Sequence, residues 1–584
     1  MKGSRLPLIL LVAGVALFVA HAVHFLPYAN DDAYITFRYS RFLATGRGPY
    51  FNPGEHVEGY SNLLWMLVMA PVYALGGVSA VAPFAKGLGL LCGGACLVFS
   101  YLLCRRLSPD AERGPRSIFV AGPLAAGLLA VAPSFALNSV SGLETAFYSS
   151  LLTLGVLLGT LSASDGRWRG AGVAFAAAAL TRPEGAALFA VYAAAQGASA
   201  WRGAARDGLG APREVARRLG PLIADVLLVA LAAAGQLAFR WLAYDGEWLP
   251  NTYYAKAGGV GSVTSWEYVR QGALSPFLGF LGIAAAAAGF WLGGLRRRAV
   301  LPVACTAVAG ALLPLVTGPD WMLGWRLVAP VLPLLAAVVA MSWTGLAARW
   351  IGRPTWLAPT LLLALLPVAA WTESGARAAF DRIVTVRARG YDEGHVALAR
   401  WLHGGAAKPG DTVALMDIGI VGYLCDDLRI LDITGLTDRH IAKSPGTFLE
   451  KRYDPAYVLD RRPEIIVIVF AAEGDPRRPP ENLHLVPWSP EEDAILASQE
   501  FRREYVRPRE APGTGDPWTV DLARSLGAER VFHHAYPDRF YLLAAFRRRP
   551  PPGAQKPNSA PTENVSALQL TELRGPTSIS PVAR

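Results

Sequence analysis

Charged residues are scarce in this sequence: Asp, Glu, Lys and Arg make up 17% of its 584 residues, whereas hydrophobic residues make up 53%. The apolar residues fall in long blocks separated by short polar turns, which is typical of a polytopic membrane protein. Cysteine is also scarce. Of the five cysteines, four lie inside apolar segments and Cys425 stands alone, so their spacing provides neither a disulfide framework nor a zinc site.

The net charge is +10, but the basic residues are not grouped as they are in a nucleic-acid-binding protein. The arginines stand in short runs between apolar blocks and in the C-terminal tail, and such runs are typical of the cytoplasmic loops of a membrane protein. We therefore expect no nucleic-acid partner. The runs that we place on the cytoplasmic side are 105–106, 113–116, 167–169, 202–218, 296–298 and 349–353.

No small-residue cleavage site follows the first apolar run, residues 6–26. The run comes after Lys2 and Arg5 and is long enough to span a bilayer. A cleaved signal peptide is the competing interpretation. Because the cleavage site is missing, we expect an uncleaved helix whose N-terminus is cytoplasmic.

The positive-inside rule then places residues 63–75 in the outer interface as a short helix and the second span at 84–103. Hydropathy predicts roughly eleven spans in all. The two segments at 171–180 and 186–200 are short for full spans, so the TRPEG turn between them could be re-entrant. The remaining spans are expected at 117–135, 143–161, 221–243, 274–295, 300–316, 327–347 and 356–371.

We expect three parts in the chain. Residues 1–371 form a helical membrane domain whose first outer loop is 27–62, and residues 547–584 form a disordered tail rich in Pro, Ser and Arg. Between them, residues 372–546 alternate strand-like runs with polar stretches, which predicts a soluble α/β domain on the outer face. The strand-like runs are 412–417, 465–470 and 541–546.

Two adjacent carboxylates, Asp31 and Asp32, stand where the first span leaves the membrane. Either Asn30 or Asp31 could simply cap a helix that begins near Asp32. Capping needs only one acid, however, and a second carboxylate at the lipid boundary carries a desolvation cost. We therefore expect the pair to be functional. Adjacent helix positions point about 100° apart, so the two acids should have different roles.

Further polar clusters fall in loops on the same face of the predicted topology. In EGYSN, Ser61 or Asn62 could be only a helix cap. In TRPEG, an Arg182–Glu184 pair satisfying a Pro-broken turn competes with a phosphate contact. Lys256 could bind a lipid phosphate or simply snorkel at the interface.

A last polar loop, GPDWMLGWR, has Asp320 and Arg326 on either side of two tryptophans. The tryptophans could be interfacial anchors, or Trp321 could pack against the apolar face of a sugar. The outer loops together make a plausible cavity.

These blocks resemble the GT-C membrane glycosyltransferases, in particular the group that contains the mycobacterial terminal β-(1→2)-arabinofuranosyltransferase. The resemblance is carried, in family order, by DDAYITFRYSRFLATGRGPYFNPGEHVEGYSNLLW, LTRPEG, LPNTYYAK, GPDWMLGWRLVAPVLP and DIGIVGYLCDDLRILDITGLTD. It covers most of the chain up to about residue 440. One block departs: GGDFMHGR in the family reads GPDWMLGWR here, which keeps Asp320 but changes the surrounding residues.

The resemblance implies a transferase that takes a sugar, arabinofuranose in that group, from a polyprenyl-phosphate donor. The acceptor would be a glycan, lipid or protein of the cell envelope, at the outer face of the cytoplasmic membrane. An aspartate of the first outer loop would be the general base, which maps onto Asp31 or Asp32; we favour Asp31, with Asp32 orienting substrate. We expect no cofactor. A metal ion held by Asp31, Asp32 and Asp320 is conceivable, but no octahedral oxygen cage can be argued from the sequence, so we expect no metal site. The substrate-binding candidates are Arg38, Glu58, Tyr60, Asn62, Glu144, Arg182, Glu184, Asn251, Lys256, Asp320, Trp321 and Arg326.

A transporter or flippase of lipid-linked sugars is the alternative function, since it also needs many helices and membrane acids. Transporters bind substrate near the bilayer midplane and often contain internal repeats. This chain shows no repeat, and its acids lie in loops at one face. In the C-terminal domain, the stretch 417–423 has too few glycines for a dinucleotide site and is more simply a turn after a strand.

Overall fold

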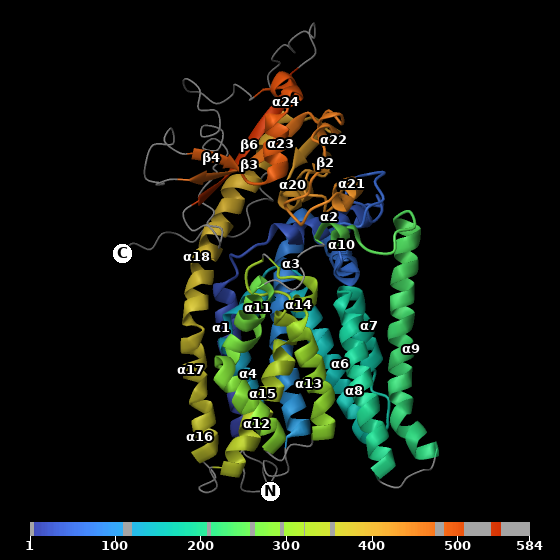
Figure 1. The fold of residues 1–584 in the computed structure, drawn as a ribbon, viewed down its shortest axis with the longest axis vertical. Helices are drawn as coiled ribbons and strands as arrows, with labels where there is room; N and C mark the ends of the chain where they lie inside the picture. Colours follow the sequence, from blue (N-terminus) through green and yellow to red (C-terminus); the bar gives the residue numbers. More distant parts are fainter. Residues whose placement is uncertain are drawn as a thin grey trace.

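The computed structural model describes residues 5–108, 120–206, 212–256, 263–292, 297–320, 322–350, 357–473, 484–506 and 539–549. A helical bundle forms one end of the molecule and an α/β domain the other, with short helices between them (Figure 1). Trp321 and most of the predicted tail, 550–584, lie outside the described residues.

The bundle consists of helices with few charges. Among the described residues, six helices are long and apolar enough to span a membrane, or up to eight if each of two bent pairs is one span. The main helices are α1 (Leu6–His24), α3 (Leu63–Leu107), α4 (Ala121–Val131), α5 (Pro133–Ser139), α6 (Thr145–Asp165), α7 (Ala171–Thr181), α8 (Glu184–Arg206), α9 (Pro212–Ala243), α12 (Gly279–Leu292), α13 (Arg297–Leu312), α15 (Leu332–Trp350), α16 (Leu357–Leu363) and α17 (Leu365–Thr372). The chain is therefore a multi-pass membrane protein.

The count of six to eight is lower than the roughly eleven spans that hydropathy predicts. The segment expected at 171–180 is the 11-residue helix α7, which is only about 16 Å long. The segment expected at 356–371 is likewise a short apolar helix. The segment at 117–135 bends by 73° between α4 and α5, where Pro133 begins the second helix. Hydropathy measures how apolar a segment is, and it does not register that a proline interrupts the helix within that segment.

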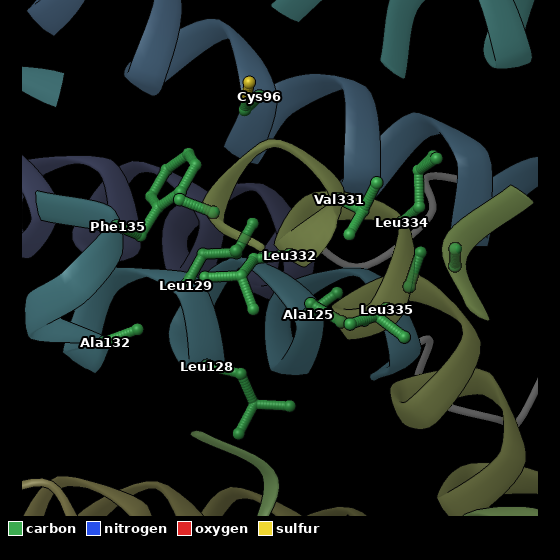
Figure 2. Packing of buried hydrophobic residues seen from close by; sticks show 14 of the residues in the cluster. Cys96, Ala125, Leu128, Leu129, Ala132, Phe135, Val331, Leu332, Leu334 and Leu335 are labelled. Carbon is green, nitrogen blue, oxygen red and sulfur yellow. The ribbon is translucent and has the colours of Figure 1, made fainter. Parts of the chain in front are cut away.

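Helix α15 lies at the centre of the bundle, and most of its residues are buried. Its Leu332 and Leu335 pack with Leu129 and Ala125 of α4, and Cys96 of α3 lies close by (Figure 2). Small residues at such contacts let helix backbones approach closely, which is how membrane helices associate.

Helix α3 is interrupted at Gly77, whose φ of 70° and ψ of −164° are not helical. The interruption separates residues 63–76 from 78–107. It falls two residues after the segment that the sequence predicts to lie in the interface, and Leu75 beside it is strongly exposed. Glycine adopts this positive φ without strain.

The C-terminal domain contains a mixed sheet of six strands among the described residues, in the order β2-β1-β3-β6-β5 with β4 also paired to β3. Strands β1 and β3 run parallel, and β6 pairs antiparallel with the whole of β3. The predicted α/β domain is confirmed, with strands at the three expected places. The strands are β1 (Thr412–Leu415), β2 (Arg429–Asp432), β3 (Ile465–Glu473), β4 (His484–Pro487), β5 (Tyr505–Val506) and β6 (Arg539–Arg548).

Helix α18 (Ser374–Gly390) continues from α17 and carries the chain from the bundle to the sheet (Figure 1). Short helices fill the junction and the sheet's faces. They are α2 (Asp31–Ala44), α10 (Asn251–Lys256), α11 (Val263–Val269), α14 (Pro314–Thr317), α19 (Ala397–Trp401), α20 (Ile418–Leu424), α21 (Arg439–Lys443), α22 (Ala456–Leu459), α23 (Pro490–Ala497) and α24 (Gln499–Glu504).

The two domains share one apolar core at this junction. Ile35 and Tyr39 of α2 and Phe51 of the first loop are buried in the same cluster as Val421 of α20 and Leu431 of β2. Burial of apolar surface is the main favourable term in such packing. The first loop is thus held as firmly to the C-terminal domain as to the bundle, and this fixes the position of the acidic pair.

Candidate functional site

Helix α2 begins at the acidic pair. The side chain of Asn30 accepts a hydrogen bond from the backbone N–H of Asp32 at 3.1 Å, so Asn30 is the cap of this helix. Neither acid is needed for that purpose. Asp31 and Asp32 occupy the first turn of α2 and point in different directions, which gives them separate surroundings.

Asp31 is buried against the C-terminal domain. Its Oδ2 accepts a hydrogen bond from the N–H of Gly419 at 2.8 Å, and its Oδ1 accepts one from the N–H of Ile420 at 2.7 Å. These are among the first N–H groups of α20, which have no partner inside their own helix. Asp31 therefore caps a helix of the other domain. Burial and the nearby carboxylate of Asp417 raise the pKa of Asp31 to about 7.

Asp32 points into a polar space instead, with its side chain 18% exposed. Its Oδ2 lies 3.6 Å from Nζ of Lys256, the last residue of α10. Among the described residues, its carboxylate accepts no hydrogen bond. Burial raises the pKa of Asp32, and the positive charges of Lys256 and Arg326 oppose that shift. Of the two carboxylates, Asp31 is buried and Asp32 is partly exposed.

Asp320 and Arg326 form a second part of the same polar space. Asp320 Oδ2 accepts a hydrogen bond from Nε of Arg326 at 2.7 Å and forms an ion pair with Nη2 at 2.6 Å. Its Oδ1 accepts a hydrogen bond from the N–H of Met322. Burial alone would raise the pKa of Asp320, but the charges of Arg326 and Lys256 outweigh it and lower that pKa. The structure thus brings Asp32, Lys256, Asp320 and Arg326 together.

A buried network lies beside this group, where α7 ends and α8 begins. Arg182 donates from Nη1 to Glu144 at 2.7 Å and from Nη2 to Glu184 at 3.0 Å. Asn62 donates to the other oxygen of Glu144 at 2.8 Å. One guanidinium therefore compensates two buried carboxylates. The network joins the first loop to the ends of three helices of the bundle, α6, α7 and α8. The predicted Arg182–Glu184 pair therefore exists and has Glu144 as a third member.

Arg38 lies away from the polar space, fully buried between the two domains. It donates from Nε to the carbonyl of Phe51 at 2.7 Å, from Nη1 to Cys425 at 3.0 Å and from Nη2 to Leu428 at 2.9 Å. A guanidinium whose N–H groups face carbonyl oxygens is satisfied without a carboxylate. The structure gives Arg38 the role of joining the domains, and substrate has no access to it.

Glu58 and Tyr60 likewise hold the first loop in place, and Asn251 joins α10 to the C-terminal domain. Glu58 forms a buried, two-pronged ion pair with Arg240 of α9. The hydroxyl of Tyr60 lies 2.9 Å from that of Tyr244. The amide of Asn251 donates to the carbonyls of Gly435 at 2.8 Å and Leu436 at 3.0 Å. Each of these contacts orients a backbone segment near the site, and we assign none of them to substrate.

Two residues of the C-terminal domain adjoin the acidic pair and were not predicted. His395 Nε2 lies 2.9 Å from Oδ2 of Asp417, the residue just before α20. Asp417 acts electrostatically on both Asp31 and Asp32. Burial would lower the pKa of His395, but Asp417 and Asp31 raise it. The sequence offered a signal in DIGIVGY at 417–423, which follows a strand, but nothing local shows which loop it meets.

The described residues contain no group of three or more His, Cys, Asp or Glu side chains placed to hold a metal ion. The absence of a metal cofactor stays a prediction of the sequence.

Comparison with known proteins gives matches to part of the chain and to its overall shape. Residues 384–520 match the model of a domain of unknown function, DUF8728. No curated protein sequence matches the chain. Solved structures with a similar fold are ArnT from Cupriavidus metallidurans bound to undecaprenyl phosphate (14% identity, TM-score 0.45, 74% of this chain and 86% of that chain) and in the apo state (15%, 0.44, 79% and 92%). The arabinosyltransferase EmbB from Mycobacterium smegmatis is similar at 14% identity and a TM-score of 0.35, over 80% of this chain and 44% of that chain.

Proposed function

We propose that this membrane protein is a glycosyltransferase that moves a sugar from a polyprenyl-phosphate donor to a hydroxyl of a cell-envelope acceptor. The observation that carries the proposal is the partly exposed carboxylate of Asp32, which lies 3.6 Å from the ammonium of Lys256 and within electrostatic range of Arg326. The reaction needs a base to take the proton of the acceptor hydroxyl and cations to stabilise the departing phosphate, and both must lie close together. The site would lie at the outer face of the cytoplasmic membrane.

Asp32 is the general base in this proposal. A sugar hydroxyl is a poor nucleophile, and a carboxylate within hydrogen-bond reach can take its proton as the new glycosidic bond forms. Asp31, which the sequence favoured for this role, has both oxygens engaged by backbone N–H groups of α20. The geometry therefore supports the reverse assignment, with Asp31 positioning the turn on which Asp32 stands.

Lys256 and Arg326 would stabilise the leaving group. As the bond between the anomeric carbon and the phosphate oxygen breaks, the anomeric centre becomes oxocarbenium-like and the departing polyprenyl phosphate gathers negative charge. Asp320 holds the guanidinium of Arg326 through one hydrogen bond and an ion pair, which orients its remaining N–H groups. Arg182 is compensated by two carboxylates and contributes mainly structure.

A lipid-linked donor accounts for the architecture. Helices α2 and α10, which carry Asp32 and Lys256, lie where the bundle meets the C-terminal domain (Figure 1). A phosphate at the membrane surface would enter there while its polyprenyl chain stays in lipid. Asp417 of the C-terminal domain acts electrostatically on Asp32, and this domain would meet the acceptor. The sugar would be a pentose or a hexose, with arabinofuranose the member that the sequence resemblance suggests.

The test is a transfer assay with the purified full-length protein, a panel of radiolabelled polyprenyl-phosphate sugars and a cell-envelope extract as acceptor. We expect transfer by the wild type and a loss of about 10² to 10⁴-fold in turnover for Asp32→Asn, the range that a general base supplies. Asp165→Asn, at the far end of α6, is the matched control and should keep full activity.

The same assay distinguishes a transporter. If the donor binds but no sugar of the panel reaches an acceptor, and Asp32→Asn binds donor as the wild type does, the catalytic assignment fails. Movement of the intact donor across proteoliposome membranes would then identify a flippase.

A further inference from the structure

A cavity of about 460 Å³ opens on one flank of the bundle, away from the candidate active site. It lies among α1, α4 and the junction of α17 with α18, which stand on the same side of the bundle (Figure 1). None of Asp32, Lys256, Asp320 and Arg326 lines it. Above it, Phe380 packs against Phe25 and Trp325, so aromatic rings stand between the cavity and the Asp320 loop.

The wall of the cavity changes from apolar to polar along the helices. Leu17 of α1, Val131 of α4 and Leu366 of α17 form its apolar part. His21, one turn beyond Leu17, and Glu373 and Arg377, at the far end of α17 and in α18, form its polar part. Glu373 is the first charged residue after the apolar helix ends at Thr372. An apolar slot with a polar end at the membrane boundary has the shape of a lipid site.

Two buried acceptors at the polar end have no hydrogen-bond partner among the described residues: Nε2 of His21 and Oε2 of Glu373. The Nδ1–H of His21 donates to the carbonyl of Ala130 at 3.0 Å, which leaves Nε2 of the neutral ring as an acceptor. Ser275 donates to the other oxygen of Glu373. Burying such groups without a partner is unfavourable, so a ligand with N–H or O–H donors fits this end of the cavity.

Arg377 is exposed and lies one helical turn beyond Glu373, and no ion pair joins the two among the described residues. The polar end therefore combines a cation with acceptors that include a carboxyl group. A headgroup that carries both a phosphate and a primary ammonium matches this arrangement, with the phosphate on Arg377 and the N–H groups on Glu373 and His21. A polyprenyl phosphate has the phosphate but no such donors.

We propose that this cavity binds a membrane aminophospholipid of the ethanolamine type as a resident lipid. Its acyl chain lies along Leu17 and Leu366, and its headgroup joins α1 to the α17–α18 junction. The lipid would brace the connection by which the C-terminal domain is attached to the bundle. The site is separate from the donor site of the proposed transferase and does not depend on that proposal.

Native mass spectrometry of the delipidated full-length protein in detergent tests this, with phosphatidylethanolamine, phosphatidylcholine and phosphatidylglycerol of identical acyl chains added singly. Choline keeps the positive charge but has no N–H donor, so it is the matched control lipid. We expect the ethanolamine lipid to be retained about tenfold more than the choline lipid, the effect of one charge-assisted hydrogen bond.

Variants assign the effect to the cavity. Glu373→Gln should reduce the preference for ethanolamine over choline severalfold, and Arg377→Gln should lower retention of both lipids together. Arg382→Gln, an exposed arginine of the same helix outside the cavity, should change neither. If Glu373→Gln does not fold, the comparison of the three lipids on the wild type decides alone.

Equal retention of all three lipids would overturn the proposal and leave only unselective contact with the bilayer. Tightest binding of phosphatidylglycerol would also overturn it, because the phosphate alone would then carry recognition. Equal loss of retention in Arg377→Gln and Arg382→Gln would show that the cavity is not the binding place.

Discussion

The carboxylate of Asp31 accepts a hydrogen bond of 2.7 Å from the backbone N–H of Ile420, a residue 389 positions later in the chain. Asp31 also accepts a hydrogen bond from the N–H of Gly419. A side chain of α2 thus caps the N-terminus of α20, which belongs to the C-terminal domain. The turn that carries Asp32 is consequently part of the interface between the domains. Access to the site and attachment of the C-terminal domain are thus linked physically, and several measurable consequences follow.

Asp31→Asn should loosen the attachment of the C-terminal domain. An asparagine offers one oxygen where two N–H groups converge, and its own NH₂ faces the second of them, so about 1–3 kcal/mol of local stability is lost. Hydrogen exchange of the backbone amides of Gly419 and Ile420 measures this directly. Asp32→Asn is the control and should leave this exchange unchanged, whereas equal exchange in the wild type and Asp31→Asn would contradict the capping role.

Gly419→Ala should disrupt the same contact by steric overlap. A Cβ at Gly419 would lie 1.9 Å from the carbonyl oxygen of Asp31, and backbone cannot easily move away. Alanine is otherwise the better helix residue by about 1 kcal/mol, so the substitution would stabilise α20 if that helix stood alone. Thermal unfolding in detergent distinguishes the two effects. Gly404→Ala, where a Cβ meets nothing within 4 Å, is the control and should unfold as the wild type does.

The interface should weaken as pH rises through neutrality. The pKa of Asp31 is raised to about 7 and that of His395 is also raised, so the folded state holds protons that the unfolded state releases. For both groups the stabilising contribution is present below the unfolded pKa and is lost as pH passes the folded pKa. We expect the unfolding temperature to fall from about pH 4 to about pH 7, between the unfolded and folded pKa values of Asp31. The contribution of His395 is lost above its ordinary pKa of 6.5. The fall should be smaller in Asp31→Asn, and an identical pH profile in that variant would exclude this cluster as the cause.

Arg326→Lys should reduce turnover by about 10²-fold, because a single ammonium cannot both satisfy Asp320 and meet the departing phosphate. The Michaelis constant for the donor should change much less, since charge on the leaving group grows mainly in the transition state. Steady-state kinetics of the transfer assay separate the two constants. Arg169→Lys, an exposed residue at the opposite end of the bundle, should have neither effect. A change confined to the Michaelis constant would place Arg326 in ground-state binding instead.

Arg182→Gln should be among the most destabilising single changes in the membrane domain. It leaves the carboxylates of Glu144 and Glu184 buried without their cation, which typically costs about 3–5 kcal/mol. Adding Glu184→Gln to the same chain should recover part of the loss, as measured by thermal unfolding. If the double variant is less stable than Arg182→Gln alone, the pairing with Glu184 is not what Arg182 supplies.

Much of this arrangement is local and was therefore predictable from the sequence. Long apolar blocks can satisfy their backbone groups inside lipid only as helices, so composition alone determines a helical membrane domain. The short apolar runs TVAL at 412–415 and IIVIVF at 465–470 likewise indicate strands, because β-branched side chains such as Val and Ile fit a pleated surface. The sequence also indicated candidate site residues. Carboxylates and arginines beside membrane-spanning segments are energetically unfavourable, so those that are present are expected to be functional.

The roles of those residues were decided by contacts between distant segments. Adjacent positions in the chain cannot show that Asp31 meets α20 while Asp32 meets Lys256, because that division depends on how the C-terminal domain sits on α2. The same holds for Arg38, whose N–H groups are satisfied by carbonyls nearly four hundred residues away. The sequence by itself therefore determined the elements and the chemical groups, and the tertiary structure decided which carboxylate remains reachable.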